Sequence, residues 1–405
     1  MTTASVVQRV NPAPLSLVII AYLSFIILGI PIGLRGVAWE SGARSDFGQP
    51  VGALGALILA NTISYFVSSA LASRLIQRFG LGNAMLVSFL LTGVVLFGYA
   101  LSPAWALMIV FGVVVGFGLG FVDAAMNVYF AAHHGPRLMN WLHACFGIGS
   151  AVAPLLLNYI LAQGGTWRTS YMVTGALYLV LLVMIIVTRS QWTVSRTDED
   201  EHSNPASSRA TLALAIVWIG ILTFFVYGGV EMVPSDWGAR LFTAARGIEQ
   251  TEANNRVSLY WFFFTIGRIV FGFIVPYFKA ATLVRLCMIG TIVGAALLAA
   301  PPLNSANTVG VIGLAVGAFA MSPLFALLVT TTQDKLGPTH APNAISFQVA
   351  AASAGIGILP TMTGFVAEQI PSAVPIVWIL LSVLVLTLFE VSLRVNLKAG
   401  SIKVK

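Results

Sequence analysis

Long apolar runs separated by short polar segments dominate this chain. Twelve of the runs reach about 20 residues, the length that an α-helix needs to cross a bilayer core about 30 Å thick. Unpaired backbone amides are too costly in lipid, so each run is predicted to be a membrane-spanning helix. The predicted spans are 15–38, 50–73, 83–102, 104–131, 140–162, 167–188, 211–234, 254–278, 281–301, 307–333, 342–368 and 372–394.

One long polar stretch, Arg189 to Arg209, follows the sixth predicted helix and contains the acidic run 198–201. An acidic run can recruit a partner, but we interpret this one as a solvated, flexible linker. The predicted organisation is therefore a six-helix bundle over 1–188, a linker over 189–210 on the cytoplasmic side, and a second six-helix bundle over 211–405.

Composition agrees with a membrane protein. Charged residues make up 9% of the chain and hydrophobic residues 58%, whereas a soluble domain carries about 25% charged residues. The two cysteines lie in apolar runs, which excludes a disulfide scaffold and Cys-rich zinc modules, and no metal site is expected. The net charge of +7 comes from basic residues scattered in short loops, a topology signal that excludes a nucleic-acid partner.

The distribution of Lys and Arg between the two sides predicts the orientation. Fourteen of these residues fall on the side of the termini and the linker, six fall on the other side, and Arg268 lies inside a helix. The positive-inside rule therefore places both termini in the cytoplasm, in what we expect to be a bacterial inner membrane. The first apolar run lacks a small-x-small cleavage site at its end, so we interpret it as a retained helix.

The two halves of the chain show similar landmarks at nearly equal offsets. An offset of about 206 aligns the Gly and Pro of the fifth helix with those of the eleventh, and offsets near 198 and 201 align two further pairs. Such offsets indicate a duplicated six-helix unit, with a solute site near the midplane between the halves. The aligned pairs are Gly149 with Gly355, Pro154 with Pro360, Trp39 with Trp237, and Arg78 with Lys279.

This arrangement resembles the major facilitator superfamily over essentially the whole chain. The resemblance implies an all-α integral membrane protein with twelve transmembrane helices in two six-helix pseudo-repeats. The loop motif that the superfamily carries after helix two is partly present as residues 73–80: its glycine is Ser73 and its acid is Gln77. Arg78 and Gly80, with Lys279 at the matching place in the second half, are the resulting gate or structural residues.

Three segments narrow the likeness to the fucose permease-like, sugar:proton symporter branch. They are Leu142 to Gly149 with Pro154, Tyr227 to Glu231 followed by Trp237, and Gly267 with Arg268. The resemblance implies proton-coupled sugar import, with an acid in helix four as proton carrier and polar residues of helix five near the sugar. Asp123 stands at a comparable place in helix four. Members of the branch carry other solutes as well, so the substrate does not follow from the match.

Asp123 is also the strongest clue from the residues alone. An ionised carboxylate in so apolar a helix is costly unless it is paired, and such a group can hold or release a proton as the cavity hydrates. If helices four and five turn near Gly135, Asn127 and His143 lie at similar depth, and Asp123 about 6 Å away. A polar cluster of Asp123, Asn127, Asn140 and His143 is predicted on the cytoplasmic side of the midplane, with His143 in proton relay, substrate contact or packing.

Arg268 and Glu231 are the other ionisable residues expected within the membrane. Arg268 cannot lose its proton and needs an acid, carbonyl groups or an anionic solute, and we expect a structural ion pair with Asp123 or Glu231. Glu231, flanked by Gly228, Gly229 and Pro234, is a candidate for proton coupling, solute binding or gating, or a simple interfacial carboxylate. Asp236 is expected beyond the helix and solvated.

A sugar site needs amides or carboxylates for hydroxyl groups and a ring for the apolar face. Most aromatic side chains are expected at the interfaces or toward lipid. Glycines 112, 116 and 120 are expected to permit close helix packing. The predicted substrate-binding residues are Asn127, Asn140, Trp141, Tyr227, Trp237, Arg268 and Gln348, and the predicted proton-coupling residues are Asp123, His143 and Glu231.

The sequence thus predicts a secondary transporter, a proton symporter of a sugar or sugar-like polar solute that works by alternating access. A proton-coupled exporter of drugs or organic anions is the alternative. No nucleotide-binding loop is present, so no cofactor is expected and an ion gradient or simple facilitation remains as the energy source. An enzyme is not expected, since no set of nucleophile, base and orienting group is found. The expected partners are a small-molecule solute, protons and the lipid bilayer, with a monomer as the functional unit.

Overall fold

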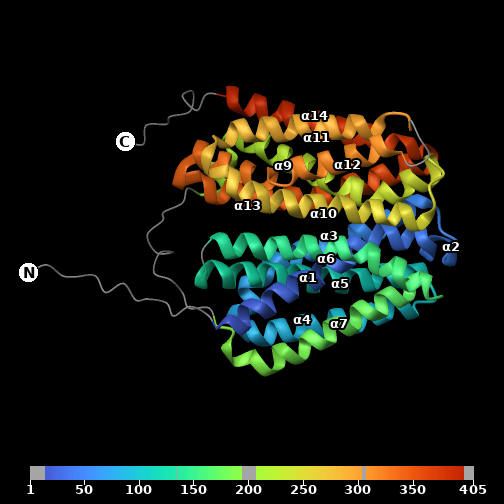
Figure 1. Ribbon diagram of the computed structural model, residues 1–405. Helices are drawn as coiled ribbons and strands as arrows, with labels where there is room; N and C mark the ends of the chain where they lie inside the picture. The colour runs from blue at the N-terminus through green and yellow to red at the C-terminus, as the bar shows by residue number, and fades with distance from the viewer. Residues whose placement is uncertain (1–13, 135, 194–206, 303–306, 396–405) are drawn as a thin grey trace, which may run out of the picture.

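The computed structural model describes residues 14–134, 136–193, 207–302 and 307–395, which are almost entirely helical and contain no strand. Figure 1 shows two helical bundles side by side, with their helices roughly parallel. The first, here called the N bundle, contains α1 (Leu15–Ala38), α2 (Arg44–Asp46), α3 (Leu54–Phe79), α4 (Leu81–Leu101), α5 (Trp105–His133), α6 (Pro136–Ala162) and α7 (Trp167–Thr188). The second, the C bundle, contains α8 (Ser208–Leu212), α9 (Ala215–Arg240), α10 (Gln250–Ile274), α11 (Ala280–Ala299), α12 (Thr308–Met321), α13 (Leu324–Gln369) and α14 (Val374–Arg394).

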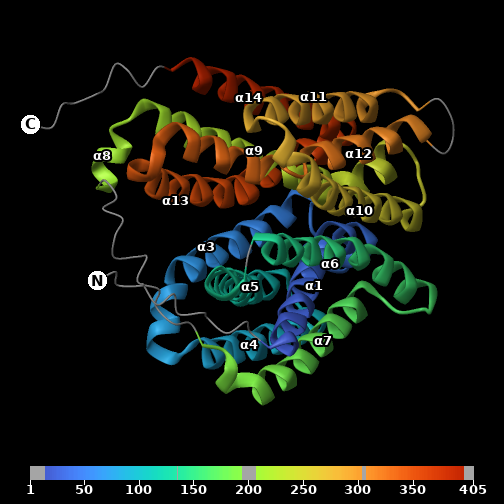
Figure 2. The same cartoon turned by 60° about the vertical axis from the view of Figure 1, so that its left-hand side comes forward.

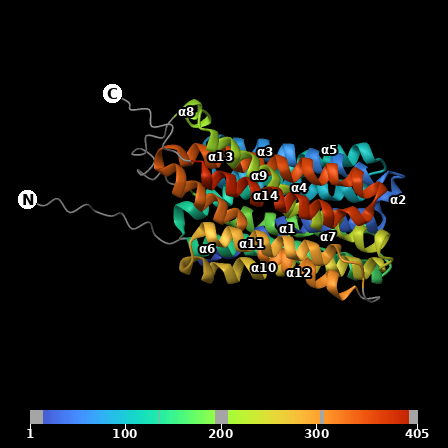
Figure 3. The ribbon, with the colours of Figure 1, turned by 90° about the horizontal axis from the view of Figure 1, so that it is seen from above.

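Each bundle is held together by pairs of long helices. In the N bundle α1 packs on α6, α3 on α5 and α4 on α7, and in the C bundle α9 packs on α13 and α14, and α11 on α12. The two bundles meet where α6 packs on α10 and α3 on α13. Figure 2 shows the same division from another side, and in Figure 3, seen from above, the two bundles overlap with their helices roughly parallel.

The start of α1 and the end of α14 lie at the same end of the molecule, the left end in Figure 1. We call this end the termini face and the opposite end the far face. Because successive long helices run in opposite directions, α1, α6 and α9 end at the far face, and α3, α5 and α10 end at the termini face. The acidic run 198–201 lies outside the described residues.

Eleven helical segments among the described residues are long and apolar enough to cross a membrane. One of them, Thr308–Gln369, has 62 residues, about three bilayer cores at 1.5 Å per residue. This segment turns back at Gly337, where φ is 60° and ψ is −176°, a left-handed conformation that glycine adopts without a steric penalty. The turn separates two crossings and gives the twelve spans that the sequence predicts.

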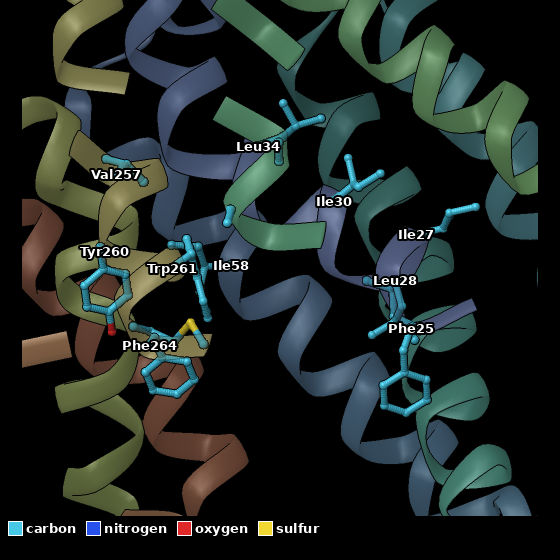
Figure 4. Close-up of a cluster of buried hydrophobic side chains, with 14 of the residues drawn as sticks. Phe25, Ile27, Leu28, Ile30, Leu34, Ile58, Val257, Tyr260, Trp261 and Phe264 are labelled. Carbon is cyan, nitrogen blue, oxygen red and sulfur yellow. The ribbon is translucent and has the colours of Figure 1, made fainter. Parts of the chain in front are cut away.

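Apolar side chains fill the interior and also cover the outside. One cluster of buried apolar side chains runs through both bundles, and Figure 4 shows a part of it contributed by α1, α3 and α10. Large apolar side chains exposed on the outer surface would be unfavourable in water and fit a lipid environment. Strongly exposed examples are Leu101 (69%), Val187 (74%), Phe273 (68%) and Leu380 (62%).

Two aligned glycines occupy the same packing position in the two bundles. A Cβ atom at Gly149 of α6 would collide with the backbone oxygen of Ile26 in α1. A Cβ atom at Gly355 of α13 would collide with the backbone oxygen of Phe225 in α9. The offset between the glycines, 206 residues, thus corresponds to an equivalent helix contact in each half.

Candidate functional site

A cavity of about 780 Å³ lies between the two bundles. Helices α1, α3, α5 and α6 line it from the N bundle, and α9, α10 and α13 line it from the C bundle. Most of the lining is aliphatic or aromatic, and the charged residues on its wall are Arg35, Asp123, Glu231 and Arg268. A solute in this cavity therefore meets a few ionisable groups in apolar surroundings.

The close contact between α3 and α5 sets the position of Asp123. Gly116 and Gly120 of α5 lie so close to α3 that a Cβ atom would collide with the backbone oxygens of Asn61 and Tyr65, respectively. This is the close packing expected for the small residues of α5. It brings Asp123, one turn beyond Gly120, beside the Tyr65 side chain.

Asp123 begins a hydrogen-bonded chain that crosses from α3 through α5 to α6. Tyr65 Oη donates to Asp123 Oδ2 at 2.6 Å, and Asn127 Nδ2 donates to Asp123 Oδ1 at 3.2 Å. The Asn127 Oδ1 atom lies 3.1 Å from His143 Nε2. The structure therefore brings together three members of the predicted cluster, and the side chain of the fourth, Asn140, lies outside the described part of the chain.

Glu231 and Arg268 form an ion pair on the C-bundle wall. Arg268 Nη2 lies 3.8 Å from Glu231 Oε1, and the guanidinium group covers the ring of Phe264 at 4.4 Å. The Arg268 side chain keeps 23% of its surface exposed and the Glu231 side chain 11%. Of the two acids that the sequence offers to Arg268, Glu231 is the partner in this conformation.

The hydrogen-bonded chain ending at His143 and the ion pair of Glu231 with Arg268 lie at similar depth on opposite walls of the cavity. Gly147 of α6 is in close contact with Thr265 of α10, where a Cβ atom on the glycine would collide with the threonine hydroxyl. His143 lies four residues and Arg268 three residues from this contact, both toward the termini face, which is about 6 Å and 4.5 Å along the helices. A solute between the walls can therefore reach both groups.

Asp236 is the clearest correction to the sequence prediction. It lies within α9, which continues through Pro234 to Arg240, and it is 1% exposed rather than solvated. Its carboxylate accepts three hydrogen bonds from Arg35 of α1, at 3.0, 2.9 and 2.8 Å. The tertiary contact between α1 and α9 satisfies the charge and allows the helix to extend past the proline.

Further contacts join the far ends of the bundles. A second ion pair links Arg240 of α9 to Glu40 beyond α1, at 3.6 Å. Asn158 of α6 donates to Asn255 of α10 at 2.9 Å and accepts from Asn254 at 2.8 Å. With Arg35 and Asp236, these groups close the cavity toward the far face.

Toward the termini face the cavity wall continues along α3 and α13. Its lining there includes Phe66, Ala70 and residues 345–347. Phe66 is 43% exposed, and the nearby lining residue Val349 is 40% exposed. The cavity lining is therefore partly exposed on this side, whereas ion pairs and hydrogen bonds join the two bundles at the far face.

Several predicted site residues lie away from the cavity. Trp237 is fully buried and its indole N–H donates to the Pro360 carbonyl at 2.7 Å, so it packs α9 on α13. Gln348 is buried and accepts from Thr332 at 3.0 Å beside a separate small pocket of about 30 Å³. Trp141 is 42% exposed on α6. Arg78, Gly80 and Lys279 lie at helix ends on the termini face.

Sequence reasoning missed two pairings that shape the site, Tyr65 with Asp123 and Arg35 with Asp236. The partners are 58 and 201 residues apart, so no local spacing reveals them. For Asp123 the available signal was an acid inside an apolar run, since such an acid needs a partner.

Comparison with known proteins defines the class. Residues 15–360 match the sequence profile of the Major Facilitator Superfamily, and the chain belongs to this family of membrane transporters. The predicted resemblance to this superfamily is therefore confirmed.

Relatives by sequence are distant. The chain is 22% identical to "Protein TsgA homolog" of Buchnera aphidicola subsp. Acyrthosiphon pisum (strain Tuc7) over 217 residues, which are 53% of this chain and 54% of that protein. The match thus spans about half the length of that relative. A TsgA homolog of Buchnera aphidicola subsp. Baizongia pistaciae (strain Bp) is 19% identical over 364 residues, 88% of this chain and 89% of that protein.

Solved structures share the fold. The nucleoside transporter NupG superposes with a TM-score of 0.74 at 14% identity, over 94% of this chain and 99% of that one. A D-xylose-proton symporter gives 0.70 at 16% identity, over 93% and 97% of the two chains. FucP in the outward conformation gives 0.63 at 17% identity, over 93% and 98%. At these identities the likeness shows the fold alone.

Proposed function

We propose that this transporter moves a sugar-like polar solute together with protons by alternating access. The observation that carries the proposal is the chain of Tyr65, Asp123, Asn127 and His143 on the cavity wall. A carboxylate there can take up a proton when the cavity is hydrated, and the neutral acid is far less costly to enclose when the bundles close. The names of the structural neighbours, a D-xylose-proton symporter and a nucleoside transporter, support a hydroxyl-rich solute.

In this mechanism the bundles rock about the contacts of α6 with α10 and of α3 with α13. The solute and a proton on Asp123 stabilise a closed intermediate, and separation of Arg35 from Asp236 then opens the far face. We place the termini face in the cytoplasm, because the loops on that side carry the excess of Lys and Arg. Imported solute is then released through the cavity as the structure presents it.

The alternative, an exporter of organic anions or drugs, would need a net positive or strongly hydrophobic cavity. The pairing of Arg268 with Glu231 cancels the charge that an organic anion would seek. The charges on this wall therefore favour symport of a neutral solute over export of an organic anion.

Charge movement across proteoliposomes tests the proposal. The purified protein is challenged with neutral sugars, organic anions and lipophilic cations at two pH values. A sugar-evoked inward current that grows at acidic outer pH is the expected result. Responses to organic anions or lipophilic cations alone would contradict sugar symport and favour the exporter hypothesis.

A further inference from the structure

Most polar side chains on the N-bundle wall of the cavity are already bonded within the protein. Each such bond removes a donor or an acceptor that a solute would otherwise use. The bonds are Tyr65 to Asp123 (2.6 Å), Ser69 to the Gly120 carbonyl (2.9 Å), Asn61 to the Leu57 carbonyl (2.8 Å) and Arg35 to Asp236 (2.8 Å). The N-bundle wall therefore offers few open groups to a polar solute.

The C-bundle wall has an open polar group of three side chains, Tyr227, Glu231 and Arg268, here called the triad. Tyr227 is 1% exposed and lines the cavity, and its hydroxyl interacts with the Glu231 carboxylate without reaching the geometry of a hydrogen bond. A buried hydroxyl without a hydrogen bond is unfavourable, and the cavity is where a partner can come from.

The triad suits a pair of neighbouring hydroxyl groups. The 3.8 Å separation of Arg268 from Glu231 is too long for a direct hydrogen bond, so guanidinium donors and carboxylate acceptors stay open between them. Each hydroxyl of a vicinal diol both donates and accepts, so it can donate to Glu231 while accepting from Arg268 or Tyr227.

Charge on the cavity wall favours a neutral solute. Arg35 is compensated by Asp236 and Arg268 by Glu231. Asp123 is then the remaining charged side chain on the described wall, and protonation makes the wall neutral. An anion would meet no uncompensated positive charge there, and bringing it into the cavity would be costly.

The rest of the cavity offers flat apolar surface. Phe25 and Phe146 contribute from the N bundle and Phe325 from the C bundle. Phe25 meets His143 edge-on at 5.6 Å between ring centres, and Phe325 lies 6.2 Å from the Tyr227 ring. A free hexose has hydroxyl groups around its whole ring and would leave several of them unpaired here, whereas a planar group stacks well.

We propose that the solute is a neutral glycoside with a flat apolar substituent, such as a nucleoside or an aryl glycoside. Its diol binds the triad, and its flat group lies against Phe25, Phe146 and Phe325. This inference rests on the proposed function and narrows its substrate class.

Proton uptake by proteoliposomes of the full chain, read with an entrapped pH dye, tests the substrate class. The probes are uridine, 2′,3′-dideoxyuridine, a nitrophenyl glucoside, glucose, gluconate and tetraphenylphosphonium. Uridine and the nitrophenyl glucoside are expected to acidify the interior, with apparent affinities at least about tenfold tighter than those of dideoxyuridine and glucose, since each polar pairing lost leaves a buried group unmatched.

The outcomes separate this inference from the proposed function. Glucose acting better than both glycosides would overturn the glycoside class and leave sugar symport intact. Glycoside uptake measured with radiolabel but without acidification would overturn proton coupling and support the class. Responses to gluconate or tetraphenylphosphonium alone would overturn both.

Tyr227→Phe tests the triad directly. The hydroxyl's interaction with Glu231 lacks hydrogen-bond geometry, so we expect an unchanged melting temperature in detergent. The preference for uridine over dideoxyuridine should fall from about tenfold to within about twofold. Tyr178→Phe is the matched control, because Tyr178 in α7 is also buried with an unpartnered hydroxyl but lies outside the cavity lining. An unchanged preference for uridine over dideoxyuridine in Tyr227→Phe would contradict binding of the diol by the triad.

Discussion

Asp123 has a hydrogen-bond donor on each of its two oxygens. Tyr65 donates to Oδ2 from α3, and Asn127 donates to Oδ1 from the next turn of α5. Two donors fit an ionised carboxylate, which only accepts. Protonation must therefore rearrange at least one of these contacts, and His143, linked through Asn127, lies within the same chain of groups.

Asp123→Asn separates solute binding from proton coupling. The amide has nearly the same shape as the acid but carries no exchangeable charge, so solute binding and folding should persist. Uphill accumulation driven by a pH gradient should disappear, as measured with radiolabelled solute in proteoliposomes. Glu390→Gln, which removes an acid of the C bundle paired with Arg285 at 3.0 Å, is the control and should accumulate normally. Normal accumulation by Asp123→Asn would remove this residue from the mechanism.

Tyr65→Phe tests the positioning role of the tyrosine. Loss of this donor leaves the Asp123 carboxylate with Asn127 as its remaining side-chain donor among the described residues, so the pH dependence of transport should change. The solute affinity at saturating proton concentration should change little, because Tyr65 acts through Asp123. A purely structural role would lower the transport rate at every pH without moving the midpoint. Tyr178→Phe again serves as the control.

Single residues were predictable where local spacing decides their position. The spacing across the turn between α5 and α6 predicted Asn127 and His143 at similar depth and Asp123 about 6 Å away. The prediction that Asp236 is solvated was wrong, because Pro234 suggests a helix end and the partner Arg35 lies 201 residues away in the sequence. The prediction that Trp237 binds the substrate fails for the same reason. Because α9 extends past Pro234, the Trp237 ring packs on α13 and does not enter the cavity.

Helix contacts depend on small residues that sequence patterns identify well. Gly149 and Gly355, aligned from sequence, occupy the equivalent contact of α6 with α1 and of α13 with α9. The spans were also predictable, since they follow from apolar length. The predicted spans 307–333 and 342–368 leave residues 334–341 outside any helix, but the helix continues on both sides of Gly337. Prolines 338 and 342 lie near the start of the second crossing, where missing amide donors are tolerated.

Gly149→Ala should weaken the α1–α6 contact. The new methyl group meets backbone, which cannot move aside as a side chain can, so overpacking should cost about 1–3 kcal/mol. The matched control is Gly272→Ala in α10, where a Cβ atom meets nothing within 4 Å and alanine favours the helix. Melting in detergent should shift down for Gly149→Ala and stay equal or rise for Gly272→Ala. Equal melting of both variants would contradict the close contact.

At the scale of the whole molecule, the charges on α1 and α9 determine which face is closed. Arg35 of α1 pairs with Asp236 of α9, and Arg240 of α9 pairs with Glu40, which follows α1. Each pair joins opposite bundles, so outward opening has to separate both. Such buried pairs contribute little net stability relative to apolar contacts, but losing one partner leaves a buried charge that is strongly unfavourable.

Asp236→Asn should therefore shift the transporter toward the far-face-open conformation. The unpaired Arg35 destabilises the closed state by about 3–5 kcal/mol, and hydration of the opened gate relieves this cost. The measurement is labelling of Ile32→Cys, a cavity position on α1, by an impermeant maleimide applied to the far face, with Cys145 and Cys287 replaced by serine.

Labelling of Asp236→Asn should be at least several-fold faster than in the parent, and Glu390→Gln should match the parent. The double variant Arg35→Gln with Asp236→Asn carries no buried charge at the gate, so its labelling should fall back toward the parent rate. That reversal distinguishes an electrostatic gate from general loosening of the fold, which the second substitution would increase. Parent-like labelling of the single variant would show that other far-face contacts, such as Asn158 with Asn254, keep the cavity closed.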